Sequence, residues 1–466
     1  KFGIYQEHTW SDLANRVACC AMGFKKLGLG HGQRLALMGD PCAEYMICEL
    51  AGEALGAVIY GIYPTSSQKE MKYLMEDGGA SIFVAEDQEY VDRILPLFDE
   101  LVHLNHIVVI DYQGMFMYEH SSLIPYETLM ADGEQLHRSC AGAFEKIVSN
   151  VKPADGAFIV YTSGTTGNPK GVLNSHGKHL AGTYNIIDRF PILAEQPHRT
   201  VIYLPLCHIL GKDVAITLPL LSRIVPHYGE DIEDLGQTIF EVAPTNLFTV
   251  PRYMQKFVSQ IIVGIENSSW IKKSVYQLSL KIGRRYIKKF WEGDANFLLS
   301  ALYRVCYHIS FRPILNKIGF DQLKLVVSGG APLPSEVMGL WQIYGVSLAE
   351  MYGQTETGGA IIAGQQQHFP RPGNVGRPPT GWEIEFGDNN EILVKANDIF
   401  EGYWKAPEQT KEVLDEEGWL HTGDVGEWTP EGDLKIVDRV RDIIVTSGGK
   451  TLSPTYIENA LRSSAY

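Results

Sequence analysis

The sequence predicts an α/β protein in which parallel sheets are covered by helices, followed by a smaller antiparallel β part. Two observations predict this fold. Short apolar runs alternate with stretches of helical periodicity through most of the chain, which is typical of parallel sheets. From about residue 370 to 437, short strand-like runs are separated by Gly, Asn and Asp turns, which is typical of antiparallel sheets. The 466 residues are enough for two to four structural units.

The alternation begins with a helix expected over residues 9–28, which Thr9 or Ser11 can cap. Residues 99–150 are polar and irregular, and we expect them to form a loop-rich joint. The further expected elements are strand 34–38, helix 41–56, strand 57–60, helix 68–77, and strands 81–85, 157–161, 201–204, 248–250, 325–327, 383–386, 392–394 and 434–437.

Composition excludes several classes of protein. Hydrophobic residues make up 45% and charged residues 20%, which is ordinary for a globular chain and unlike a disordered, collagen-like or coiled-coil one. The net charge of −15 argues against a nucleic-acid partner. No run reaches about 18 uninterrupted apolar residues, so no membrane-spanning helix is expected. The seven Cys are an odd number and show neither a CxxC motif nor a zinc-binding spacing, which is typical of reduced thiols, so we expect a cytoplasmic protein.

A long, mostly helical stretch is expected at residues 252–320. Five basic residues in it fall on one helical face, and four apolar residues fall on another. The basic residues are Lys281, Arg284, Arg285, Lys288 and Lys289, and the apolar ones are Ile282, Tyr286, Phe290 and Trp291. One interpretation of helix 281–291 is peripheral contact with the anionic inner face of a membrane. The alternative is a solvated face beside an ordinary core stripe.

The most informative segment runs from Tyr161 to Gly171, directly after a predicted buried strand. Gly164 and Gly167 allow successive backbone N–H groups to point into one concavity, which can bind phosphate oxygens. Lys170 adds a positive charge, and four hydroxyls add donors. These hydroxyls belong to Thr162, Ser163, Thr165 and Thr166. Pro169 before Lys170 makes the segment different from a Walker P-loop.

This segment resembles the phosphate-binding signature of the adenylate-forming superfamily, which includes acyl-CoA synthetases, adenylation domains of peptide synthetases and beetle luciferase. Other signatures of that superfamily follow in the same order. Their residues are Ser328, Gly329, Gly330, Ala331 and Pro332 on the adenine side, Tyr352, Gly353, Gln354, Thr355 and Glu356 in the aromatic and acidic motif, His421–Asp424 in the ribose motif, and residues 438–442 in the hinge. The resemblance covers residues 9 to about 460, and it implies that ATP binds to these motifs and to Ile436.

Each motif also has a physical rationale. The ring of Tyr352 offers a surface on which adenine can stack. Glu356 is a hard oxygen ligand for Mg²⁺ on the phosphates, and the resemblance adds Thr166 to that metal site. Asp424 can accept hydrogen bonds from both ribose hydroxyls, and Arg439 can reach the ribose or the α-phosphate. The resemblance implies catalytic roles for Thr166, Lys170, Glu356, Arg439 and His208.

The resemblance also implies an acyl pocket. His208 matches a position next to the acyl carboxylate, although a buried structural histidine is the alternative. Gly330 belongs to the same pocket, and Tyr253 matches an aromatic position that gates the acyl tunnel in some relatives, with a core aromatic as the alternative. His421 is expected to be structural. The helical stretch 252–320 is similar to that of long-chain acyl-CoA synthetases.

The implied domains are an adenylating N-terminal domain over residues 1–438 and, over residues 439–466, a hinge followed by the beginning of a small α+β C-terminal domain. Arg441 matches the hinge residue, where relatives often carry Asp or Lys. Gly448 and Gly449 match glycines beside the pantetheine tunnel for CoA. No residue here can be assigned to the catalytic lysine that relatives carry late in that domain.

The implied reaction activates a hydrophobic, in the first place long-chain fatty, carboxylic acid with ATP and transfers the acyl group to CoA. The alternatives are a ligase for aryl or sterol-side-chain acids, an acyl-AMP ligase that serves a carrier protein, and a non-catalytic membrane-associated homologue. The oligomeric state stays open, with a dimer as one option.

Overall fold

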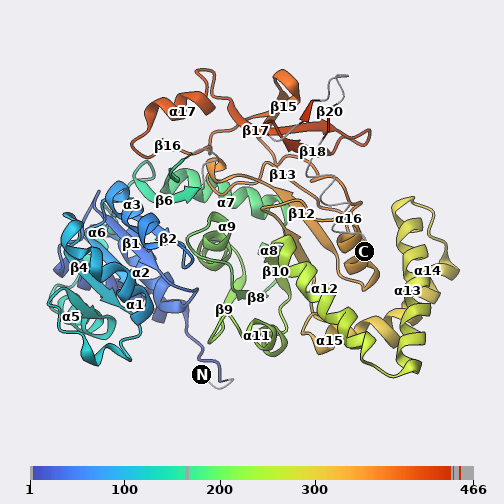
Figure 1. Cartoon of the computed structure of the whole chain (residues 1–466), viewed down its shortest axis with the longest axis horizontal. Helices are drawn as coiled ribbons and strands as arrows, with labels where there is room; N and C mark the ends of the chain where they lie inside the picture. The colour runs from blue at the N-terminus through green and yellow to red at the C-terminus, as the bar shows by residue number, and fades with distance from the viewer. Residues whose placement is uncertain (1–3, 163–166, 442–443, 446–450, 453–466) are drawn as a thin grey trace.

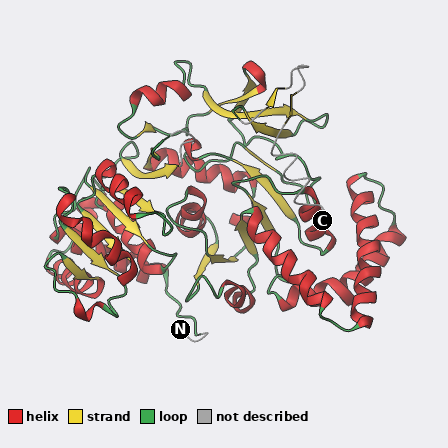
Figure 2. Ribbon diagram, in the orientation of Figure 1, coloured by secondary structure: helices red, strands yellow, loops and turns green. Residues whose placement is uncertain are grey.

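An eight-stranded sheet organises the N-terminal part of the chain in the computed structural model, which describes residues 4–162, 167–441, 444–445 and 451–452 (Figures 1 and 2). The strand order is β16-β7-β6-β2-β1-β3-β4-β5. Neighbours from β6 to β5 are parallel, whereas β7 and β16 are added antiparallel at one edge. The strands are β1 (Arg34–Met38), β2 (Val58–Ile62), β3 (Ile82–Ala85), β4 (His106–Val109), β5 (Leu123–Pro125), β6 (Gly156–Thr162), β7 (Lys170–Ser175) and β16 (Gly402–Tyr403).

Helices cover both faces of this sheet, which confirms the predicted α/β class. Leu35 and Leu37 of β1 lie in one core with α1 and α2, and Ala36 and Met38 lie in a second core with α3 and α4. Alternate residues of one strand are thus buried on opposite sides, as expected for a parallel sheet. Thr9 caps α1 with a capping box. The helices are α1 (Trp10–Lys26), α2 (Ala43–Ala54), α3 (Gln68–Gly78), α4 (Gln88–Ile94), α5 (Tyr126–Ser139) and α6 (Ala143–Val148).

The expectation of a loop-rich joint at residues 99–150 was wrong. This segment supplies β4, β5, α5 and α6, and the two strands extend the parallel sheet beyond β3. Helix α5 lies against α1 so closely that a Cβ on Gly133 would stand 1.8 Å from the carbonyl oxygen of Cys19. A glycine in mid-helix lowers helix propensity, but here it permits the contact between the two helices.

A second sheet with the order β10-β11-β12-β13 occupies the middle of the molecule, beside the pair β8 and β9 (Figure 1). Its first three strands are parallel, and β13 is antiparallel to β12. The strands are β8 (His198–Ile202), β9 (Ile224–Tyr228), β10 (Asn246–Thr249), β11 (Leu325–Ser328), β12 (Leu348–Tyr352) and β13 (Ala363–Gly364). The helices are α7 (His176–Arg189), α8 (Ile192–Glu195), α9 (Ile209–Lys212), α10 (Leu218–Leu221), α11 (Leu235–Val242) and α16 (Ser335–Ile343).

The predicted helical stretch between β10 and β11 is confirmed. It consists of α12 (Pro251–Glu266), α13 (Trp270–Trp291), α14 (Phe297–Cys306) and α15 (Arg312–Lys317). Figure 1 shows α13 and α14 side by side at one end of the molecule. Within the described ranges, none of the helices combines the length and the apolar character that crossing a bilayer requires.

The predicted antiparallel part is also confirmed, as a sheet with the order β14-β15-β17-β18. Its elements are β14 (Glu383–Phe386), β15 (Glu391–Lys395), α17 (Pro407–Val413), β17 (Leu420–Trp428) and β18 (Leu434–Arg439), followed by the pair β19 (Ile444–Val445) and β20 (Thr451–Leu452).

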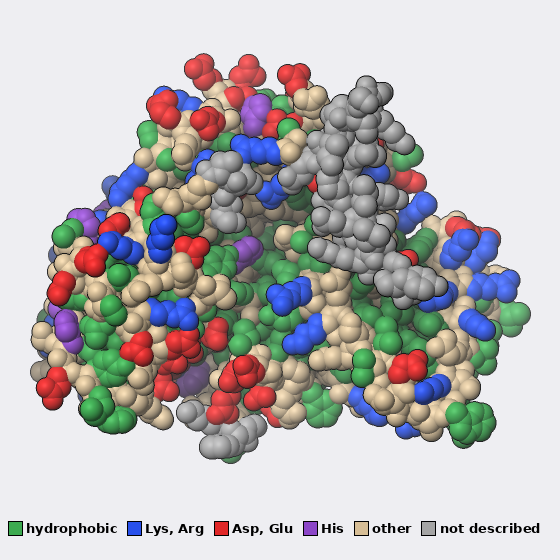
Figure 3. Space-filling model, in the orientation of Figure 1, with side chains coloured by type: hydrophobic (Ala, Val, Ile, Leu, Met, Phe, Trp, Pro, Cys, Tyr) green, Lys and Arg blue, Asp and Glu red, His purple; other side chains and the backbone are tan. Residues whose placement is uncertain are grey.

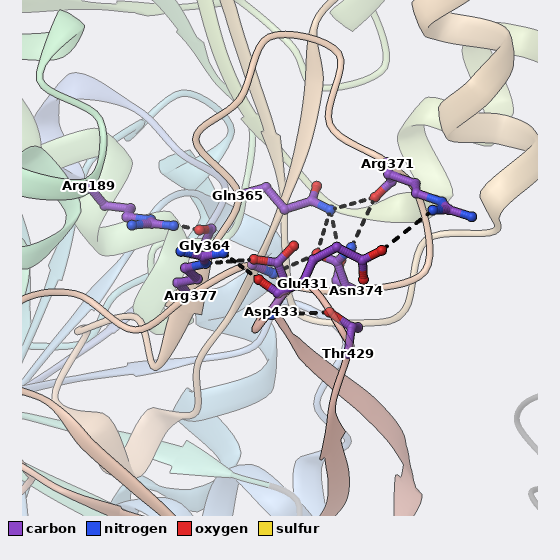
Figure 4. Close-up of polar contacts among 10 residues, drawn as sticks. Arg189, Gly364, Gln365, Arg371, Asn374, Arg377, Thr429, Glu431 and Asp433 are labelled. Carbon is purple, nitrogen blue, oxygen red and sulfur yellow. Dashed lines mark hydrogen bonds and ion pairs between the residues drawn. The ribbon is translucent and has the colours of Figure 1, made fainter. Parts of the chain in front are cut away.

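A polar network fastens this sheet to the second one (Figure 4). The Arg377 guanidinium lies 3.0 Å from an Asp433 carboxylate oxygen, and the Arg377 backbone bridges to Gly364 of β13. Arg189 of α7 donates to the carbonyl of Gly364 at 2.6 Å, and Gln365 donates to the carbonyl of Asn374 at 2.9 Å. The network sets the position of the β17–β18 hairpin, which carries the ribose motif, relative to β12.

Candidate active site

A cavity of about 1380 Å³ is lined by residues of the eight-stranded sheet, the second sheet and the antiparallel sheet. Its volume exceeds what one small ligand occupies, so it has room for a nucleotide and a second substrate. The predicted site residues that line it are Thr162, Gly167, Lys170, His208, Gly330, Gly353, Gln354, Thr355, Glu356, Arg439 and Arg441. Six further predicted residues, Ser163, Gly164, Thr165, Thr166, Gly448 and Gly449, lie outside the described residues.

The predicted phosphate-binding segment connects β6 to β7, which pair antiparallel. Thr162 and Lys170 are a cross-strand pair at the base of that connection. Helix α3 holds both sides of the base, because the Tyr161 hydroxyl donates to Asp77 at 2.7 Å and the Tyr73 hydroxyl donates to the carbonyl of Pro169 at 3.2 Å. The hairpin thus directs Lys170 into the cavity from a buried strand.

Tyr403 connects Lys170 to Glu356 in the wall of the cavity. Its hydroxyl donates to Glu356 Oε1 at 2.8 Å, and the Lys170 Nζ lies 4.9 Å from the centre of its ring, within reach of a cation–π interaction. Burial and the neighbouring Glu356 raise the pKa of the Tyr403 hydroxyl, so it stays a donor at neutral pH. Sequence analysis missed Tyr403, because only the pairing of β16 with β7 brings it to this place.

The donor set at this end fits Mg²⁺ bound through phosphates. Among the described residues, no group of three or more His, Cys, Asp and Glu side chains could hold a metal ion by itself. Protein Mg²⁺ sites that carry nucleotides commonly use one or two carboxylates, with phosphate oxygens and water as the other ligands. Glu356 in the cavity wall meets that need, and the role predicted for Thr166 falls outside the described residues.

The ribose motif is centred on Asp424, which is 6% exposed. One of its oxygens accepts hydrogen bonds from the Tyr352 hydroxyl at 2.6 Å and from Gln354 Nε2 at 2.7 Å, and the other lies 3.5 Å from Arg439 Nε. Asp424 and Arg439 face each other in the register of β17 and β18. Burial raises the pKa of Asp424, and these partners partly counter that shift. His421, expected to be structural, lies 3.3 Å from Glu391.

The adenine side is only partly in the cavity wall. Gly330 lines the cavity, and its φ of 78° is a conformation that favours glycine. The other four predicted residues do not line the cavity: Ala331 and Pro332 are exposed to solvent, and Ser328 and Gly329 are buried. The Tyr352 ring is buried in a core that also holds Ile436 at its edge. The stacking role of Tyr352 and the nucleotide contact of Ile436 therefore stay predictions.

Behind the adenine-side loop, Glu350 is a buried carboxyl that sequence analysis missed. It accepts a hydrogen bond from the backbone N–H of Leu333 at 3.0 Å, and burial raises its pKa to about 8. At neutral pH it is mostly protonated. No local pattern in β12 marks it, because its burial depends on the loop that folds over it.

His208 lines the cavity next to the apolar residues Ile209 and Leu210. It caps the short helix α9, with Nδ1 accepting a hydrogen bond from the backbone N–H of Leu210 at 3.2 Å. Burial lowers its pKa, so the ring is neutral and its proton is on Nε2, which is free to donate to a bound oxygen. Apolar residues of the cavity wall include Ile186, Ile209, Leu210 and Ile361.

Tyr253, the predicted gate, does not line this cavity among the described residues. It lies near the start of α12 and packs edge-on against Tyr203, with ring centres 4.7 Å apart. Its gating role stays a prediction.

A buried group of charged residues lies behind His208 and was also missed. Lys212 of α9 forms an ion pair with Glu49 of α2, and its Nζ lies 4.3 Å from the centre of the Phe158 ring. Burial lowers the pKa of Lys212 to about 7 and raises that of its neighbour Asp213. The pair ties α9, which follows His208, to α2 on the first sheet.

Comparison with known proteins identifies the family of the chain. The sequence matches the AMP-binding enzyme family over residues 2–404. The long-chain-fatty-acid–CoA ligase FadD15 of Mycobacterium bovis is 27% identical over 461 residues, which cover 99% of this chain and 74% of that protein. The long-chain-fatty-acid–CoA ligase ACSBG2 of Xenopus laevis is 28% identical over 468 residues, covering 98% of this chain and 62% of that protein.

Solved structures share the fold. ATP-bound MatB from Rhodopseudomonas palustris aligns with a TM-score of 0.70 at 21% identity, over 98% of this chain and 78% of that one. The anthranilate CoA ligase AuaEII in complex with anthranoyl-AMP aligns with a TM-score of 0.69 at 20% identity, over 99% of this chain and 77% of that one. The chain belongs to the AMP-binding enzyme family, within the adenylate-forming superfamily of acyl-CoA ligases.

Proposed function

We propose that this protein is an AMP-forming ligase that activates a long-chain fatty acid with ATP and transfers the acyl group to CoA. The observation that carries the proposal is the single cavity that joins Lys170 and Glu356, the Gln354–Arg439 side and the apolar wall beside His208. A nucleotide at the polar end would place its α-phosphate toward the acid at the apolar end. Both substrates can therefore meet without water between them.

In the first step, a carboxylate oxygen of the acid forms a bond to the α-phosphorus, and the bond from that phosphorus to the bridging oxygen breaks, releasing pyrophosphate. The acid is already ionised near pH 7, so no strong base is needed. Lys170, Thr162 and the hairpin turn would bind the phosphates, and His208 Nε2–H would orient the carboxylate. Mg²⁺ held by Glu356 would neutralise charge on the leaving pyrophosphate.

In the second step, the CoA thiolate forms a bond to the acyl carbon, and the bond to the phosphate oxygen breaks, releasing AMP. We assign residues 1–438 to the adenylating domain and residues 439–466 to the hinge and the beginning of a mobile C-terminal domain. Arg441 lines the cavity at that junction, which supports its assignment as the hinge residue. The CoA roles of Gly448 and Gly449 belong to this proposal and rest on the sequence motif.

The fatty acid is favoured over other acids by two observations. The relatives named above are long-chain-fatty-acid–CoA ligases, and the wall beside His208 is apolar. An aryl acid is the second candidate, because the structurally similar AuaEII binds anthranoyl-AMP. Sterol-side-chain acids, transfer to a carrier protein, and a non-catalytic homologue are the remaining alternatives.

Hydroxamate trapping of the acyl-AMP, run with fatty, aryl, sterol-side-chain and amino acids, tests the first step, and thioester formation with CoA or a carrier protein tests the second. We expect turnover with saturated acids of about eight carbons or more, since each buried methylene adds about 0.8 kcal/mol of binding. Turnover of aryl or sterol-side-chain acids alone would replace the substrate assignment. No hydroxamate with any acid, together with no ATP binding by calorimetry, would leave only the non-catalytic alternative.

A further inference from the structure

Helices α13 and α14 form a hairpin, and the side chains on its inner face pack against each other and against the rest of the protein. Tyr286 of α13 stacks on Tyr303 of α14, with ring centres 4.1 Å apart and an angle of 9° between the rings. The Tyr276 hydroxyl lies 2.7 Å from that of Tyr344, and Trp291 donates to Gln342 at 3.0 Å. The apolar face predicted for this helix is therefore the one that packs against the protein.

A second set of apolar side chains on the same hairpin faces solvent. Ile271, Val275 and Leu278 follow the spacing i, i+4, i+7, which places them on one side of α13. Leu298, Leu302 and Val305 repeat that spacing on α14. The most exposed apolar side chains of the hairpin are Phe297 at 88%, Leu298 at 78%, Trp270 at 76% and Leu278 at 61%. Because the inner face already supplies the core contacts, these residues are surplus to folding.

The predicted basic face borders this apolar surface. Lys281, Arg284, Arg285 and Lys288 are exposed, and none of them has an ion-pair partner among the described residues. Lys289, the fifth basic residue, pairs with Glu292 at 3.0 Å and Asp294 at 2.8 Å. Figure 3 shows blue side chains gathered with green ones over the end of the molecule that α13 and α14 form.

Charge is strongly uneven along the chain. Residues 270–317 contain ten Lys and Arg against two acidic residues, whereas the whole chain has a net charge of −15. In this acidic protein, four cationic side chains without an ion-pair partner among the described residues lie beside exposed apolar stripes. This pattern is typical of a surface that binds a membrane: the cations contact the lipid headgroups, and the apolar side chains enter the boundary between headgroups and acyl chains.

We propose that the α13–α14 hairpin docks on the surface of an anionic lipid bilayer. Trp270, Leu278, Phe297 and Leu302 would enter the boundary between headgroups and acyl chains, and Lys281, Arg284, Arg285 and Lys288 would contact the phosphates. The hairpin lies on the surface and does not cross the bilayer. The inference is independent of the proposed reaction, because it needs no ATP, acid or CoA.

Vesicle sedimentation tests the docking. We expect the protein to sediment with vesicles of phosphatidylcholine mixed with phosphatidylserine, and to remain in solution with phosphatidylcholine alone. Raising the salt from about 0.1 M to about 1 M shortens the screening length from about 10 Å to about 3 Å and should release the protein. Equal sedimentation with both kinds of vesicle would overturn the role of the charges.

Two variants assign the surface. Replacing Lys281, Arg284, Arg285 and Lys288 by Gln should weaken binding about 600-fold, since each of the four neutralised charges costs roughly fivefold. The paired variant Leu278→Gln and Leu302→Gln should weaken it at least about tenfold without changing the salt dependence. The matched control replaces four exposed lysines on other elements by Gln, namely Lys25, Lys69, Lys146 and Lys152, and should bind like the parent.

Thermal melting of each variant separates loss of docking from loss of folding, and only variants that melt like the parent are compared. Unchanged sedimentation of the four-charge variant would overturn the proposal. Concentration-dependent self-association in analytical ultracentrifugation that Leu278→Gln and Leu302→Gln abolish, with no vesicle binding by the parent, would assign the surface to a second copy instead.

Discussion

The hydroxyl of Tyr352 donates a 2.6 Å hydrogen bond to Asp424, and this bond joins the second sheet to the antiparallel sheet at the candidate nucleotide site. The two residues come from β12 and β17, and Gln354 and Arg439 complete the surroundings of the same carboxylate. Asp424 is thus held by three side chains before any ribose arrives. A carboxylate positioned in this way can accept ribose hydroxyls with little loss of side-chain entropy.

The first prediction concerns this carboxylate. Asp424→Ala should lower ATP affinity about ten- to a hundredfold, because a hydrogen bond to a charged group is worth about 1.5–3 kcal/mol. Calorimetry with ATP measures the change. Tyr352→Phe keeps the Asp424 carboxylate and should lower ATP affinity only a few-fold. The exposed control Asp388→Ala should bind ATP like the parent. Equal ATP affinity of parent and Asp424→Ala would refute the ribose assignment.

The second prediction concerns the phosphate end. Glu356→Gln should slow acyl-AMP formation about 10²–10³-fold, since it removes the charge that would hold the metal at the leaving group. Tyr403→Phe should slow it about tenfold, because it removes one hydrogen bond to that carboxylate. Glu412→Gln is the matched control, as Glu412 lines the same cavity without a hydrogen bond to Tyr403. Pyrophosphate release measures all three, and a Glu412→Gln defect as large as that of Glu356→Gln would count against a metal site at Glu356.

The third prediction is a pH dependence of stability at Glu350. Its pKa is raised by burial from 4.5 to about 8 in the folded protein. An acid whose folded pKa is raised stabilises the fold fully below its unfolded pKa, and this stabilisation is lost as pH rises through the folded pKa. Glu350→Gln should therefore gain stability over the parent between pH 4.5 and 8, on the order of 1.4 kcal/mol for each pH unit in that window.

Urea unfolding at several pH values measures this gain. The exposed control on α16, Glu336→Gln, should track the parent at every pH. A difference between Glu350→Gln and the parent that stays constant with pH would mean that Glu350 is ionised in the folded protein.

The fourth prediction concerns Lys212 and Glu49. Lys212→Met or Glu49→Gln alone should lower the free energy of unfolding by about 3–5 kcal/mol, because each leaves a buried group without its partner. The double variant should lower it by less than the sum of the two single variants. Urea unfolding of the parent, the two single variants and the double variant gives the coupling free energy between Lys212 and Glu49. The exposed pair Lys411 and Glu408, 3.0 Å apart, serves as the control and should couple by no more than about 1 kcal/mol. Additive costs at Lys212 and Glu49 would contradict a buried ion pair.

Elements with a clear local pattern could be predicted from the sequence, and elements without one could not. Strand 34–38 is predicted with its observed bounds, since it is a short apolar run between the helix-ending glycines Gly28 and Gly30 and the turn residues that begin at Gly39. Residues 99–150 were misread because β4 and β5 have four and three residues, too few to show a period. Helix α5 was missed because the segment is polar and irregular in sequence, and its Gly133 is explained only by the close approach of α1.

By itself, the sequence determined the order of the motifs and the strand and glycine-rich segment that precede Lys170, because these are local features. The returning strand β7, which pairs with β6, was found only in the structure. It also located the basic face of α13, because helical spacing is local. Only the tertiary structure decided that Tyr403 lies between Lys170 and Glu356 and that Asp424 is held by Tyr352.

The same holds for the hairpin surface. Periodicity placed Ile282 and Tyr286 on one face of α13, but which apolar residues are buried depends on where α14 and α16 pack against that helix. Leu278 and Leu298 are as apolar as the core residues, and they face solvent because the inner positions are already filled. Burial is a property of the neighbours in space, which the chain brings together only when it folds.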